Sequence, residues 1–189
     1  IVVIQALLVS WACLKGWYHE DDFALRTQGA ESPWLAPDLL FQKWGGHFMP
    51  AAFLVVQVIA KTTGMAYGFI ANTLAVGQVA VFVLFYRLLV RHFGLRWPIL
   101  IPLVLVTASV PVLQAGVWWA AALNTVPFLA CLVVAVDHSL RLSRRRSGRD
   151  VAWVLGATVA ALAFYEKAVL LPLVVIAVLL ATTSGTRGG

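Results

Sequence analysis

Long apolar runs separated by short charged segments constrain the fold of this chain more than any other feature. The runs near residues 66–90 and 120–140 are each long enough to cross the ~30 Å of bilayer hydrocarbon at about 1.5 Å per residue. Hydrophobic residues make up 61% of the 189 residues, charged residues make up 12%, and the mean hydropathy is +0.89. Soluble globular domains do not have this composition, so the sequence predicts an integral membrane protein.

The predicted fold class is all-α: a polytopic transmembrane helical bundle that forms one domain over residues 1–189. About six spans are expected, near residues 1–17, 66–90, 97–117, 120–140, 151–165 and 168–183. The last two are ambiguous, because Glu166 and Lys167 interrupt an apolar stretch that is long for one helix and short for two. A hairpin turning at Glu166 is preferred, and one long tilted helix kinked at Pro172, or a re-entrant pair, is the alternative. Since Ile1 already lies within an apolar run, we expect the chain to be a piece of a longer polypeptide.

Basic residues gather in two short segments between the predicted spans. The two clusters are Arg87, Arg91, His92 and Arg96, and Arg141, Arg144, Arg145, Arg146 and Arg149. By the positive-inside rule, we expect the loops 91–96 and 141–150 on the cytoplasmic side and the segment 18–64 outside. The net charge of +6 is not spread over one face, so nucleic acid is not an expected partner.

The external segment 18–64 is predicted to carry short helices that lie in the outer membrane interface. A helix over 50–63 would be about 21 Å long, too short to span, with Pro50 in its first turn and Gly64 as its stop. Ser32 and Pro33 are predicted to start another such helix. The apolar side chains expected to press on the membrane surface there are Leu39, Leu40, Phe41 and Trp44.

Three successive carboxylates, Glu20, Asp21 and Asp22, follow the first apolar run directly. Three adjacent acids at a low-dielectric boundary need a cation, a proton or a substrate hydrogen bond to compensate them. We therefore expect a functional site here, and a solvated acidic collar at a helix end is the alternative. His19 and Phe23 flank the three acids.

An acidic pair just outside the first span, followed by a long external loop and further spans, resembles the GT-C superfamily of membrane glycosyltransferases. In that superfamily the first external loop carries the catalytic carboxylate, often in an Asp-Asp pair, and Asp21-Asp22 matches this pattern. The segment Gly45-Gly46-His47-Phe48-Met49-Pro50 is similar to the Gly/His/Pro segment of bacterial members, although these more often have His-Pro-Pro. The resemblance implies an N-terminal portion of an enzyme in a bacterial plasma membrane.

The resemblance implies sugar transfer from a polyprenyl-phosphate-linked donor to a hydroxyl of a glycan, lipid or protein acceptor. Such a transfer needs a carboxylate base, and we assign that role to Asp21. Asp22 or Glu20 is expected to orient the acceptor, and Asp21 with Asp22 would hold a divalent cation if one is used. The other predicted substrate-binding residues are His19, Arg26, His47, Glu166 and Lys167, with Lys43 as a further external cation for the phosphate.

Several of these residues also have structural interpretations. Glu166 and Lys167 would serve equally as an interfacial ion pair, and His47 would serve to hydrogen-bond its loop. Gln114 and Asn124 are expected either to line a cavity or to bond between helices. At the inner side, we expect solvated His92 and His138, and an Asp137–Arg141 pair within one helix.

Two other function classes stay open on the sequence. A transporter or lipid-carrier flippase would use the acidic residues as an entry site for cations or protons. A non-catalytic membrane assembly subunit would use them as a contact surface. The near absence of charge between residues 66 and 136, except near the span ends, disfavours the transporter.

Overall fold

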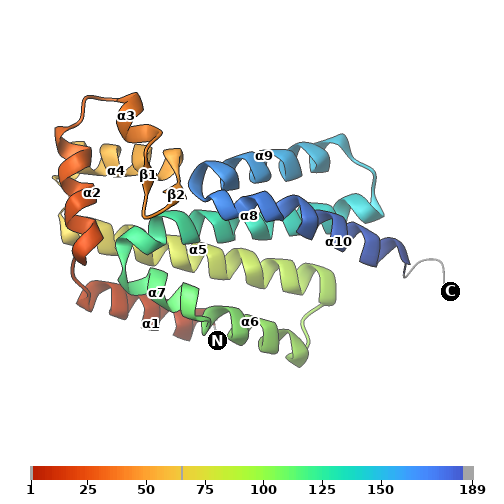
Figure 1. Ribbon diagram of the computed structural model, residues 1–189. Coiled ribbons are helices and arrows are strands. Elements are labelled where there is room, and N and C mark those ends of the chain that lie inside the picture. The colour runs from red at the N-terminus through yellow and green to blue at the C-terminus, as the bar shows by residue number, and fades with distance from the viewer. Residues whose placement is uncertain (1, 65, 185–189) are drawn as a thin grey trace.

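The computed structural model describes residues 2–64 and 66–184, and its elements are almost all helices (Figure 1), which confirms the all-α prediction. The elements of the first half are α1 (Val2–Lys15), α2 (Glu20–Glu31), α3 (Pro37–Leu40), β1 (Lys43–Trp44), β2 (His47–Phe48), α4 (Pro50–Thr63) and α5 (Tyr67–Phe93). Those of the second half are η1 (Trp97–Ile99), α6 (Leu100–Thr107), α7 (Val110–Val117), α8 (Trp119–Arg144), α9 (Gly148–Phe164), η2 (Glu166–Leu170) and α10 (Leu171–Ser184).

Helices α5 and α8 form the centre of the bundle and lie side by side (Figure 1). Both are rich in Ala, Val and Leu, and they contain 27 and 26 residues. Their close approach depends on Gly77 of α5, where an added Cβ would lie 3.0 Å from Val126 of α8. Small residues at such crossings let two apolar helices pack closely.

The prediction of about six spans holds only in part. Within the described residues, α5 and α8 are the two helices long and apolar enough to cross a membrane. The span expected over 97–117 is broken into α6 and α7 at Ala108 and Ser109. In a continuous helix a proline at position 111 would leave the carbonyl of Thr107, four residues earlier, without its donor, and α6 ends at Thr107.

The hairpin predicted around Glu166 is confirmed. Helix α9 ends at Phe164, the short 3₁₀ helix η2 reverses the chain, and α10 runs back along α8 (Figure 1). Pro172 is the second residue of α10, where its missing N–H costs no helical hydrogen bond. Ala135 of α8 packs in one apolar cluster with Ala161 of α9 and Leu171 of α10.

The segment 18–64 contains the predicted helix over 50–63, with Pro50 at its start and Gly64 in the left-handed conformation at its end (φ 58°). The predicted helix start at Ser32-Pro33 is wrong, because Ser32 ends α2 and the next helix begins at Pro37. Figure 1 shows α2 lying across the bundle, whereas α4 runs along the direction of α5. Helix α4 is therefore a packing element, whose Phe53 and Val56 are fully buried.

The four residues predicted to press on the membrane surface do not lie on one common surface. Leu39 is buried, and Leu40 packs against the same core. Phe41 is exposed and stacks on Phe48, with 6.4 Å between ring centroids. Trp44 faces a cavity. The hairpin of β1 and β2 turns through Gly45 and Gly46, both of which have positive φ.

Two predictions about the arginine-rich end are also wrong. His92 is not solvated: its side chain is 3% exposed and its Nε2 lies 2.8 Å from the Asp137 carboxylate. Asp137 does not pair with Arg141 within α8, because it binds Arg91 and His92 of α5 instead. Both loops are shorter than predicted, since α5 continues to Phe93 and α9 begins at Gly148. Sequence spacing suggested the local pair, but the packing of α5 on α8 placed closer partners beside Asp137.

Helix α2 packs on α4 through Gly29, and a substitution there tests this contact. An added Cβ would lie 2.8 Å from Val56 Cγ1 and 3.2 Å from the Val56 carbonyl oxygen. We expect Gly29→Ala to lower the free energy of unfolding by about 1–3 kcal/mol, because the two helices must separate. Thermal unfolding in detergent, followed by circular dichroism, measures the change. Gly68→Ala is the matched control, since nothing lies within 4 Å of its added Cβ; equal losses in both variants would contradict the contact.

Candidate functional site

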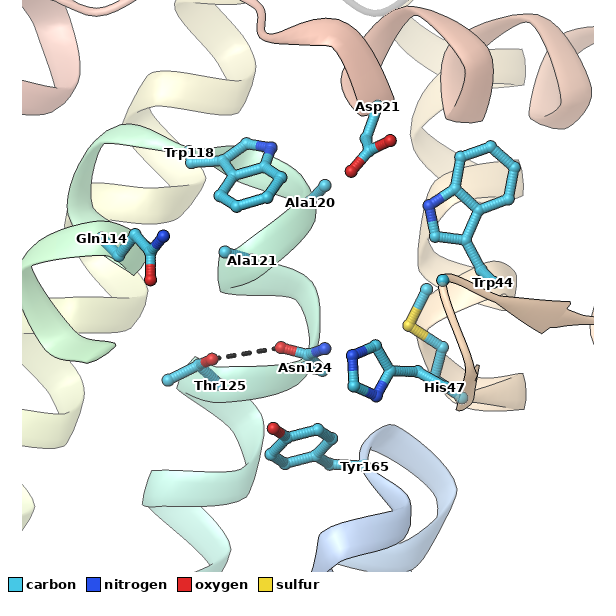
Figure 2. Close-up of a pocket in the computed structure, with 12 residues that line it drawn as sticks. Asp21, Trp44, His47, Gln114, Trp118, Ala120, Ala121, Asn124, Thr125 and Tyr165 are labelled. Atoms are coloured by element: carbon cyan, nitrogen blue, oxygen red, sulfur yellow. Dashed lines mark hydrogen bonds between the residues drawn. The ribbon is translucent and has the colours of Figure 1, made fainter. Parts of the chain in front are cut away.

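A cavity of about 410 Å³ lies where α2, the β-hairpin, the start of α8 and the α9–η2 turn meet. Its lining combines one carboxylate, one imidazole, two amides and three large aromatic rings (Figure 2). The lining residues are Asp21, Trp44, Gly45, His47, Met49, Gln114, Trp118, Ala120, Ala121, Asn124, Thr125 and Tyr165. They come from segments up to 144 residues apart (21 to 165), so folding alone assembles the cavity.

Asp22 fixes the position of α2 over this cavity. Its side chain is 1% exposed, and its two oxygens accept different backbone N–H groups. Oδ2 accepts from His19 at 2.9 Å and so closes the first turn of α2. Oδ1 accepts from Ala120 at 2.8 Å, at the start of α8. One carboxylate thus caps the positive N-terminal ends of two helices.

The burial of Asp22 has an electrostatic cost. Burial raises the pKa of the Asp22 carboxyl above its ordinary value, and the backbone hydrogen bonds from His19 and Ala120 oppose this shift without cancelling it. Both oxygens already have donors, and Asp22 is not among the residues that line the cavity. In this structure Asp22 therefore has a capping role, and its predicted role toward acceptor or metal stays a prediction.

Asp21 has the opposite environment from its neighbour. Figure 2 shows its carboxylate pointing from α2 into the space that Trp118, Trp44 and His47 border. It makes no hydrogen bond or ion pair with the described part of the chain. Asp21 is therefore a carboxylate held at a cavity wall with its oxygens available to a ligand.

His47 and Glu166 join the hairpin to the α9–η2 turn. Nδ1 of His47 lies 2.6 Å from Oε1 of Glu166, and each side chain is 34% exposed. Partial burial raises the pKa of the Glu166 carboxyl, but the His47 hydrogen bond and charge, with nearby backbone amides, outweigh it and leave the pKa below its ordinary value. This pair holds His47 at the cavity, 5.6 Å from the Tyr165 ring centroid.

Lys167 lies beside the cavity and not in its wall. Its Nζ is 5.2 Å from the centroid of the Tyr165 ring, which lines the cavity. The interaction with Tyr165 raises the pKa of Lys167, so the side chain is cationic at neutral pH. None of the described lining residues is Lys or Arg, so Lys167 supplies positive charge next to the cavity.

Two other predicted substrate-binding residues, His19 and Arg26, are not among the described residues that line the cavity. His19 is exposed at the start of α2, with its ring 6.2 Å from that of Trp118, and Arg26 is exposed further along α2. Glu20 begins α2, and its side chain lies outside the described residues. Lys43, predicted as an external cation, is exposed on β1. Over residues 2–64 and 66–184, no three His, Cys, Asp or Glu side chains form a group able to hold a metal ion.

Several residues that line the cavity were not predicted from the sequence as site residues. Trp118 and Tyr165 line the cavity, although neither was among the predicted site residues. Thr125 donates to the side-chain oxygen of Asn124 at 3.1 Å, and this pair was not predicted (Figure 2). The signal available for it was the adjacent polar pair Asn124-Thr125 inside an otherwise apolar span.

No protein-family model, no curated protein and no solved structure matches this chain. The chemistry of the site therefore has to be argued from its residues. A free carboxylate, neutral amides and flat aromatic rings around a cavity of this size suit a small polyhydroxylated ligand, since carboxylate and amides bond hydroxyls while rings cover the apolar ring face.

The double capping by Asp22 predicts a large stability effect. We expect Asp22→Ala to lower the free energy of unfolding by about 1–3 kcal/mol, because the first N–H groups of two helices lose their acceptor. Asp21→Ala, one residue away, removes the same charge without breaking a hydrogen bond to the described residues, so its unfolding temperature should stay close to that of the parent. Chemical denaturation in detergent distinguishes the two variants, and equal stability of both would refute the capping role.

The His47–Glu166 pair predicts a pH effect with a defined sign. Because the pKa of Glu166 is lowered in the folded protein, its ionised form stabilises the fold above the ordinary value of 4.5. That contribution is lost as the pH falls through the lowered value. We expect Glu166→Gln to flatten this part of the pH dependence of the melting temperature between about pH 3 and pH 6. Glu31→Gln, an exposed acid, is the control and should retain the parental slope.

Proposed function

We propose that this chain is the membrane part of a glycosyltransferase that moves a sugar from a polyprenyl-phosphate-linked donor to an acceptor hydroxyl. The observation that carries the proposal is Asp21, a carboxylate that pairs with no described residue and lies in the wall of a cavity rich in aromatic and amide groups. The resemblance of Asp21-Asp22 and of the Gly45–Pro50 segment to GT-C enzymes supports the same function.

Asp21 is the proposed general base. As the acceptor oxygen bonds the anomeric carbon of the sugar, the bond from that carbon to the phosphate oxygen breaks, and the proton of the acceptor hydroxyl passes to Asp21. The polyprenyl phosphate leaves with the electrons of the broken bond. A carboxylate in hydrogen-bond reach of the acceptor makes that proton transfer part of the transition state.

The remaining groups have positioning roles in this proposal. Trp44, Trp118 and Tyr165 cover the faces of the sugar ring, while Gln114 and Asn124 bond its hydroxyl groups. Lys167, next to Tyr165, is the proposed partner of the leaving phosphate, because a fixed cation stabilises the charge that develops there.

The proposal places the bundle across a bacterial plasma membrane with Asp21 outside. Helices α5 and α8 begin near the cavity and end at the arginine clusters, which supports a cytoplasmic position for the arginines. Exposed apolar side chains on the shorter helices support the view that these also contact lipid and complete about six membrane segments, with α6 and α7 as one broken segment. Examples are Leu7, Leu8, Leu105, Leu155 and Ile176.

Replacing Asp21 tests the proposed activity. We expect Asp21→Asn to reduce sugar transfer by about 10²–10⁴-fold, because the amide does not accept the proton, while membrane insertion and unfolding temperature stay unchanged. The assay follows radiolabel from polyprenyl-phosphate-linked sugars into the acceptor fraction of membranes that contain the chain. Asp38→Asn, an exposed acid on α3, is the matched control and should transfer normally.

The same assay separates the alternatives. Full transfer by Asp21→Asn would remove the catalytic base. Radiolabel that crosses the membrane without becoming attached to an acceptor would identify a transporter instead. Normal transfer together with lost binding of a partner protein would identify an assembly subunit.

A further inference from the structure

Arginines from three helices converge at the end of the bundle opposite Asp21. A helix of 26 residues such as α8 is about 39 Å long, so this end is remote from the cavity that Asp21 lines. Two cavities of about 430 and 640 Å³ share Arg91, Arg141 and Arg149 as lining residues and therefore adjoin. The arginines that line one or both are Arg87, Arg91, Arg141, Arg144, Arg145 and Arg149.

Two carboxylates lie among these six arginines, and both are engaged. Asp137 binds Arg91 at 2.5 Å and His92 at 2.8 Å, which ties α8 to α5. Asp150 binds His138 at 2.7 Å and Arg141 at 3.4 Å, which ties α9 to α8. These ion pairs fix the helices that carry the other arginines, so the cavity walls are positioned before a ligand binds.

The side chains of Arg87, Arg144, Arg145 and Arg149 form no hydrogen bond or ion pair with the described part of the chain. A guanidinium does not lose its proton at physiological pH, so these four exposed side chains concentrate positive charge that attracts an anion. The planar fork of a guanidinium bonds two phosphate oxygens at once. Phosphate is therefore the anion that this group of side chains fits best.

The smaller of the two cavities is apolar beneath its arginines. Leu84 and Leu88 of α5 face Val133 and Val134 of α8 there, and Trp153 of α9 closes one side. The Trp153 ring stacks on His138 with 5.4 Å between centroids and is itself 49% exposed. A soluble phosphate would leave this apolar surface uncovered. A molecule in which a phosphate is joined to an alkyl chain would cover both the arginines and the apolar surface.

We propose that this end of the bundle binds an anionic phospholipid, with the headgroup phosphate between Arg87 and Arg149 and one acyl chain on Leu84, Val134 and Trp153, the more exposed apolar side chains of this cavity. Basic pockets between membrane helices on the cytoplasmic side bind the headgroups of anionic lipids in this way. The site does not depend on the proposed glycosyltransferase activity.

Native mass spectrometry of the purified full chain in neutral detergent tests the proposal. Phosphatidylglycerol and phosphatidylcholine are titrated separately, and the lipid-bound fraction gives an apparent Kd. We expect phosphatidylglycerol to bind more tightly, and the double variant Arg87→Gln/Arg149→Gln to weaken its binding roughly 25-fold, about fivefold for each arginine. Arg149→Lys should lose part of the affinity despite its retained charge, because an ammonium lacks the fork.

The double variant Arg96→Gln/Arg146→Gln is the matched control, because these two arginines lie at the same end but line neither cavity. It should bind phosphatidylglycerol as the parent does. Equal weakening in both double variants would show diffuse surface charge and overturn the site. Release of the lipid by millimolar inorganic phosphate or glycerol 3-phosphate would overturn the lipid assignment in favour of a soluble phosphate. Circular dichroism confirms that each variant is folded.

Discussion

The hydrogen bonds of the Asp22 carboxylate determine how the segment 18–64 packs on the helical bundle. One oxygen closes the start of α2 and the other caps the start of α8, so two chain segments about 100 residues apart share a single anion. Because α2 is held in this way, the preceding side chain, Asp21, faces the cavity. The residue most important for the shape of the site is therefore not the residue proposed to react there.

The opposite wall of the cavity is held by a second long-range pair. His47 on the hairpin and Glu166 after α9 bring together segments 119 residues apart in the chain. The cavity is thus closed by polar contacts at the end of a bundle whose interior is apolar. Hydrogen bonds of this kind specify one arrangement, because each leaves a buried or half-buried polar group without a partner if the segments move apart.

The two ends of the bundle differ in charge because of side chains that the same helices carry. Helix α8 begins beside Asp21 and ends at Arg144, and α5 ends at Arg91 and His92. A sugar donor linked to a lipid phosphate would bind at one end, and an anionic lipid headgroup at the other. In both proposals a phosphate joined to a hydrocarbon chain is the ligand, which agrees with the exposed apolar surface between the ends.

Local patterns determined the helical class, the hairpin at Glu166, the helix over 50–63 and the prominence of the acidic residues, because hydropathy, proline position and charge act on neighbouring residues. The tertiary structure decided which acid is free and which is a cap, since Asp21 and Asp22 differ only in the direction that α2 gives them. It also placed Asp137 beside Arg91 instead of Arg141, and Tyr165 in the cavity wall. These outcomes depend on contacts between segments far apart in the chain, whose register and rotation no local pattern encodes.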